Sequence, residues 1–76
     1  MTFKEFVGLF KSALKDFRYF SIGKSYVDFI LSNAQSQQLR PNFICRQFEA
    51  MITLFSHDLN DGSYFYEKYL TFMTEH

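Results

Sequence analysis

Aromatic residues dominate this chain and recur at a helical spacing. Of its 76 residues, eleven are Phe and five are Tyr, and there is no Trp. Near the start, apolar side chains follow one another at intervals of three and four, as they do along one face of an α-helix: Phe3, Phe6, Val7, Phe10, Leu14 and Phe17. Side chains this large at this period must share one interior, so the sequence predicts an all-α fold.

The same periodicity divides the rest of the chain into further helical segments. We expect a single small domain over residues 1–76, built as a compact bundle of about four short helices at approximately 3–19, 22–33, 41–59 and 63–74. The second segment is rich in β-branched and aromatic residues, which leaves a strand open there as the alternative. Its helical neighbours favour a helix.

Residues that begin and end helices support these divisions. Thr2 and Glu5 have the spacing of a capping box at the start of the first helix, and Pro41 suits the first turn of the third. Gly62 is expected to end the third helix in the left-handed conformation, and Ser63 to cap the fourth.

The small size of the domain predicts apolar surface left for a partner. A core of this size supplies only about 3–5 kcal/mol unless disulfides, metals or self-association add to it. The only cysteine, Cys45, cannot form an internal disulfide. With 47% hydrophobic residues, one copy is expected to leave apolar surface uncovered, so that it binds a protein partner or forms a homodimer.

Nothing in the sequence predicts catalysis. Cys45 and His57 are expected about 18 Å apart along one straight helix, at ~1.5 Å per residue, so they form no nucleophile–base pair. The segment 58–62 has Asp, Asn and Gly like a calcium loop but lacks its register and its final Glu. We expect a protein that is not an enzyme and that uses no cofactor or metal.

Two groups of residues are candidate binding sites. The last helix carries Tyr64, Tyr66 and Tyr69, whose rings are expected to point partly outward, with core packing as the alternative. The first helix carries a basic stripe, for which a solvated face is the alternative: Lys4, Lys11, Lys15 and Arg18. Residues 1–40 contain six basic and three acidic residues, whereas residues 41–76 contain two basic and five acidic residues, so the two parts carry charges of +3 and −3.

These observations favour a small intracellular protein–protein interaction module, such as a regulator or an inhibitor. The alternative is a nucleic-acid-binding regulator that uses the basic stripe, although the net charge of zero argues against it. A third hypothesis is a peripheral membrane binder, because the first helix has Phe on one side and Lys on the other. The free cysteine, and the absence of a signal peptide or an apolar run long enough to span a membrane, predict a cytoplasmic protein.

Overall fold

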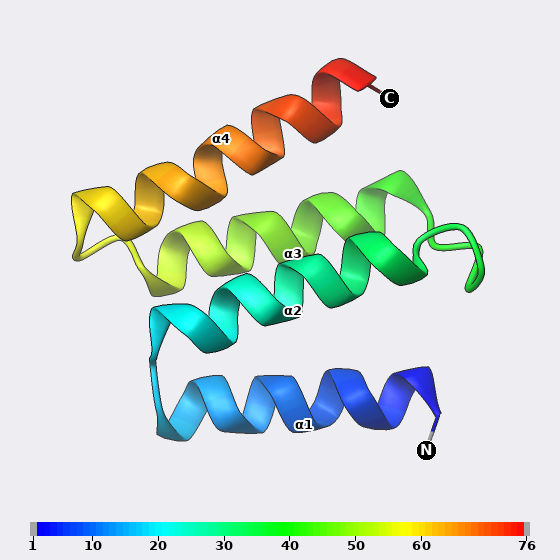
Figure 1. Cartoon of the computed structure of the whole chain (residues 1–76), viewed down its shortest axis with the longest axis horizontal. Helices are drawn as coiled ribbons and strands as arrows, with labels where there is room; N and C mark the ends of the chain where they lie inside the picture. Colours follow the sequence, from blue (N-terminus) through cyan, green and yellow to red (C-terminus); the bar gives the residue numbers. More distant parts are fainter. Residues whose placement is uncertain (1, 76) are drawn as a thin grey trace.

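Residues 2–75 fold as four α-helices. A computed structural model describes residues 2–75 and contains α1 (Phe3–Asp16), α2 (Phe20–Asn33), α3 (Pro41–Leu54) and α4 (Leu59–Glu75). Consecutive helices run in opposite directions and are joined by short connections (Figure 1). The predicted all-α bundle is confirmed, and the segment 22–33 is helical, which excludes a strand there.

The bundle is flat. Its Cα atoms extend over 32 × 30 × 16 Å, and the most extensive packing joins helices adjacent in sequence: α1 with α2, α2 with α3, and α3 with α4. Viewed down the shortest axis, the helices lie in this order across the molecule (Figure 1). α1 and α4 therefore form its two edges.

All four helices contribute to one core. Its ten buried hydrophobic residues are Leu14, Tyr26, Val27, Ile30, Ile44, Phe48, Met51, Phe55, Phe65 and Phe72. Ring contacts join helices that are not consecutive. The ring of Phe20 meets the rings of Tyr64 and Phe65 edge-on, at centroid distances of 5.3 and 5.5 Å, and so ties the start of α2 to α4.

Two of the predicted helix starts are confirmed. The hydroxyl oxygen of Thr2 accepts a hydrogen bond of 3.2 Å from the backbone N–H of Glu5, which satisfies one of the free donors at the start of α1. Pro41 occupies the first turn of α3, where its missing N–H removes no hydrogen bond.

The predicted boundary between the third and fourth helices was wrong. α3 ends at Leu54 and α4 already begins at Leu59. The carboxylate of Asp58 accepts hydrogen bonds from the backbone N–H groups of Asn60 and Asp61, at 2.9 and 3.2 Å, so Asp58 rather than Ser63 caps α4. Gly62 lies inside α4 without a positive φ and ends no helix.

The connection between α1 and α2 also differs from the predicted bounds of 19 and 22. α1 ends at Asp16 because Phe17 adopts an extended conformation, and α2 begins at Phe20 after the extended Tyr19. The exposed rings of Phe17 and Tyr19 stack on each other, with their centroids 6.0 Å apart. The earlier start of α2 brings Phe20 into the core.

Gly23 is the point of closest approach in the core. It is buried in the second turn of α2, and a Cβ atom built on it would lie 2.8 Å from Cε2 of Phe55 and 2.8 Å from Cζ of Phe65. Real Cβ contacts are almost never this short, and both neighbours are buried rings. A hydrogen atom at this position is thus what lets α2 lie against the connection between α3 and α4.

We expect Gly23→Ala to lower the free energy of unfolding by about 1–3 kcal/mol, because the added methyl group must displace buried rings. Gly8→Ala is the matched control. A Cβ there meets no atom within 4 Å, so it should stabilise α1 by about 0.5–1 kcal/mol through helix propensity. Urea unfolding followed by circular dichroism measures both effects, and equal stability of the two variants would contradict the close packing at Gly23.

Candidate partner-binding surfaces

The three tyrosines of α4 have three different environments. Tyr64 is half-buried. Its ring meets Phe20 edge-on, and the ammonium groups of Lys24 and Lys68 lie 5.2 and 5.7 Å from its centroid. Tyr66 is 53% exposed. These contacts make Tyr64 part of the packing between α2 and α4, whereas Tyr66 faces outward.

Tyr69 packs against α3. Its ring stacks on Phe48 with the centroids 5.6 Å apart and the planes 8° from parallel, and its hydroxyl donates a hydrogen bond of 3.2 Å to a carboxylate oxygen of Glu49. Partial burial raises the pKa of Tyr69 to about 12, and the hydrogen bond to Glu49 and the neighbouring Cys45 thiol act in the same direction. Of the three tyrosines, only Tyr66 is free to act mainly as a contact for another molecule.

The exposed side of α4 is nonetheless strongly apolar. Four large side chains along this helix are 46–85% exposed, and we call them the outer stripe: Leu59, Tyr66, Leu70 and Met73. Their spacing of seven, four and three residues places them on the same side of the helix. The side of α4 that faces the core carries the buried residues Phe65 and Phe72.

The basic stripe of α1 is split between two surfaces. Lys11, Lys15 and Arg18 line one groove together with residues of α2 and α3, whereas Lys4 lines a separate hollow beside Val7 and Leu39. The groove has a volume of about 310 Å³, and its apolar walls include Leu14, Met51 and Leu54. We call it the basic groove. Arg18 lies in the connection after α1 rather than on the first helix as predicted, and the sequence could not show which apolar residues of α3 lie opposite the cations.

A buried polar pair forms part of the lining of the basic groove. The hydroxyl of Tyr26 donates a hydrogen bond to Oε1 of Gln47, and Nε2 of Gln47 donates to the carbonyl oxygen of Phe43 at 3.3 Å. Tyr26 is fully buried, and this burial raises its pKa to about 12. The pair joins α2 to α3, and the buried Tyr26 hydroxyl and Gln47 amide both have hydrogen-bond partners.

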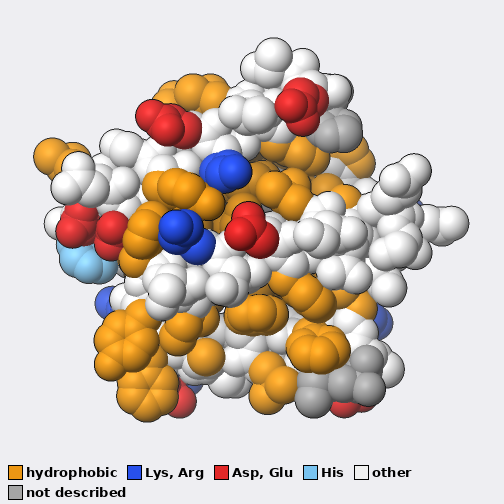
Figure 2. All heavy atoms as spheres, viewed as in Figure 1, with side chains coloured by type: hydrophobic (Ala, Val, Ile, Leu, Met, Phe, Trp, Pro, Cys, Tyr) orange, Lys and Arg blue, Asp and Glu red, His pale blue; other side chains and the backbone are white. Residues whose placement is uncertain are grey.

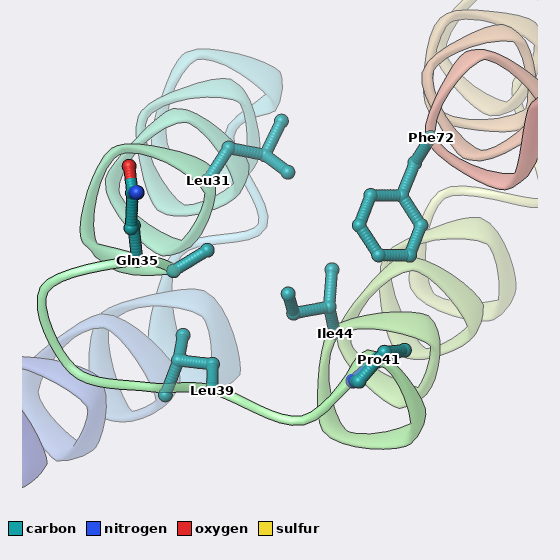
Figure 3. A pocket seen from close by; sticks show the side chains of 7 residues that line it. Leu31, Gln35, Leu39, Pro41, Ile44 and Phe72 are labelled. Atoms are coloured by element: carbon teal, nitrogen blue, oxygen red, sulfur yellow. The ribbon is translucent and has the colours of Figure 1, made fainter. Parts of the chain in front are cut away.

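Two other hollows are mainly apolar. One of about 350 Å³ lies at the α1 edge and is lined by Phe6, Leu9, Phe10, Ala13 and Ile22. Figure 2 shows that hydrophobic side chains gather over α1 on the face in view. The other hollow, of about 520 Å³, lies where the connection between α2 and α3 passes the end of α4. Leu31, Ile44 and Phe72 point into it from three helices (Figure 3). Its lining residues include no titratable side chain, so it offers no acid or base.

The reactive side chains of the chain are scattered. Cys45 is half-buried in α3, whereas His57 lies beyond the end of that helix in the exposed turn before α4. Within residues 2–75, no group of three His, Cys, Asp or Glu side chains is placed to hold a metal ion. Over the same residues, none of the helices has the length and apolar character needed to cross a membrane.

Comparison with known proteins gives no relative: no family model, curated protein or solved structure matches this chain significantly.

We expect Tyr26→Phe to lower the free energy of unfolding by about 1–3 kcal/mol, because Gln47 keeps a buried carbonyl oxygen without its donor. Replacing both members, as in Tyr26→Phe with Gln47→Met, removes the unpaired group and should cost less than the sum of the single changes. Denaturant unfolding of the four proteins measures this coupling. Additive single effects would show that the hydrogen bond contributes little.

The two raised tyrosine pKa values predict a loss of stability at alkaline pH. Tyr26 and Tyr69 both have a pKa of about 12 in the folded chain, against an ordinary value of about 10. Their neutral forms therefore stabilise the fold fully below about pH 10, and this contribution falls as the pH rises towards 12, where the unfolded chain releases protons first.

In a tyrosinate absorbance titration, we expect two of the five tyrosines to ionise late. Tyr26→Phe should flatten the fall of the unfolding free energy between about pH 10 and 12. Ionisation of all five tyrosines together near pH 10, in a chain that circular dichroism shows to be folded, would contradict this.

Proposed function

We propose that this chain is a non-catalytic protein–protein interaction module, a small regulator or inhibitor that binds its partner through the outer stripe of α4. The observation that carries the proposal is the exposure of Leu59, Tyr66, Leu70 and Met73, at 85, 53, 46 and 55%. Single exposed apolar residues are common on proteins, but an aligned row of large ones marks an interaction surface.

The spacing of the outer stripe suits a helical or grooved partner. Together with Ser63, its residues repeat at alternating intervals of four and three, the a/d pattern by which one helix packs along another. Tyr66 stands at the centre of this row, where a ring with a polar tip can pack and also hydrogen-bond. Ser63 is small and leaves room for a larger side chain from the partner.

The setting of the outer stripe also supports a binding role. The other side of α4 is already committed to the core through Phe65 and Phe72. The stripe can therefore become covered without any rearrangement of the bundle. The free thiol of Cys45 fits work in a reducing compartment such as the cytoplasm.

Nucleic-acid binding is the less favoured alternative. The basic groove brings three cations together, but its apolar walls do not match a phosphate backbone, and Lys4 lies outside it. Contacts with phosphates also dominate nucleic-acid affinity, and eight basic residues are balanced by eight acidic ones in this chain.

We expect Tyr66→Ala with Leu70→Ala to abolish capture of a protein partner in a nuclease-treated pull-down with the tagged chain, because two central contacts of the stripe are removed. Each truncation of a central interface residue typically costs more than about 1 kcal/mol, so the affinity should fall at least tenfold. Helicity should be unchanged, since both side chains are about half exposed.

Phe17→Ala with Tyr19→Ala is the control, because it removes an exposed aromatic pair from the connection between α1 and α2. It should retain the partner. If both double variants lose the partner to the same extent, the outer stripe is not the specific binding surface. Recovery of nucleic acid, with loss of all protein after nuclease treatment, would favour the alternative.

A further inference from the structure

We infer that the basic groove is the docking site for the outer stripe of a second copy of this chain, so that the protein binds itself through two different surfaces. This inference rests on the proposed function, since it identifies a partner for the outer stripe. It follows from three features of the two surfaces: their charge, their shape and their separation within one molecule.

The groove is an apolar site with cations along the side of α1. Lys11 and Lys15 lie one turn apart on α1, and Arg18 follows in the connection to α2. Across from them, Ala50 and Leu54 of α3 form an apolar wall. A ligand that fits must bring apolar side chains to the centre and negative charge to the side of α1.

The outer stripe presents that combination. Glu67 follows Tyr66 directly and precedes Leu70 by three residues, so it borders the stripe on one side. On the other side, Tyr69 holds the exposed carboxylate of Glu49 through its hydroxyl. A carboxylate thus lies on each side of the apolar row, so whichever side meets α1 brings a negative charge to the three cations beside the groove.

The volume of the groove fits side chains better than a large ligand. At about 310 Å³ it lies at the lower end of the range of ligand sites, which is about 300–1,000 Å³. It is open, with the charged ends of its lysines in solvent, so a helix can approach and insert the large side chains of one ridge. Tyr66 and Leu70, one turn apart, are the candidates.

A chain cannot fill its own groove. The groove is lined by residues of α1, α2, α3 and the connection after α1, and none of its lining residues lies in α4. Each copy would therefore offer a stripe and accept one. Such a contact joins two different surfaces, so the copies close into a symmetric dimer or a ring, or continue as an open filament where the rotation between them does not close.

The test is sedimentation velocity of the purified full chain over a concentration series up to the millimolar range. We expect the wild type to associate, and Glu67→Lys and the double change Lys11→Glu with Lys15→Glu each to raise the dissociation constant about tenfold by placing like charges together. Each variant alone has one altered surface. The Glu67→Lys variant keeps an unaltered groove, and the Lys11→Glu, Lys15→Glu variant keeps an unaltered stripe. An equimolar mixture of the two should therefore form a heterodimer.

Two control variants each reverse one charge outside the two proposed surfaces. Asp28→Lys alters an exposed residue of α2 that does not line the groove, and Lys4→Glu alters the cation of α1 that lies outside it. Both should associate like the wild type. Circular dichroism confirms that each variant is folded before its mass is interpreted.

Three results would overturn the inference. A wild type that stays monomeric throughout the series excludes self-docking. Association that Glu67→Lys weakens but the groove variant does not would indicate pairing of α4 with α4. A chain that changes mass only when a short DNA is added would assign the groove to phosphates. In the first and third cases, capture of a different protein that depends on Tyr66 and Leu70 would still uphold the proposed function.

Discussion

The close packing of Gly23 against the rings of Phe55 and Phe65 sets how the start of α2 lies against α4. The connection between α1 and α2 and the connection between α3 and α4 lie at the same end of the molecule (Figure 1). There, the absence of a side chain on α2 lets two buried rings come within 2.8 Å of where a Cβ would lie. Phe20 then packs on Tyr64 and Phe65 and joins α2 directly to α4. Without this approach the start of α2 would lose its close packing against α4, whereas the hydrogen bond between Tyr26 and Gln47 would still join α2 to α3.

The aromatic core also explains why the molecule is flat. Rings from all four helices converge near α2 and α3, which are central in the order of the helices. Among residues 2–75, no helix covers the outer side of α4, which carries large apolar residues. The flat arrangement of these helices thus leaves apolar side chains of α4 on the surface.

Helix identity was predictable from the sequence because large side chains at a period of 3.6 admit few alternatives, and Thr2 and Pro41 act locally. The boundary at Asp58 was not, because Asp58 and Ser63 are both good caps and the burial of Phe55 decides between them. The role of Gly23 was not predictable either, because it depends on rings more than thirty positions away in the sequence. A pattern along the sequence does not show which distant residues come into contact in the fold.

The outer stripe shows the same limit at the candidate site. α4 contains two apolar series one residue apart, one with Phe65, Tyr69 and Phe72 and the other with Tyr66, Leu70 and Met73. Both have helical spacing, so periodicity cannot decide which series faces the core. The predicted tyrosine cluster therefore has members on both sides of the helix: Tyr69 packs against α3, whereas Tyr66 is exposed.

The fold places the basic and acidic parts of the sequence at different surfaces. The basic first part of the sequence supplies Lys11, Lys15 and Arg18 to one groove, and the acidic second part supplies Glu49 and Glu67 to the borders of the outer stripe. Charges so distributed attract other molecules more than they stabilise the fold, because exposed pairs contribute little within one chain. Their larger effect is on the orientation and rate of encounter between apolar surfaces. Under the proposed docking of two copies, a net charge of zero reflects two complementary surfaces on one molecule rather than an absence of electrostatic character.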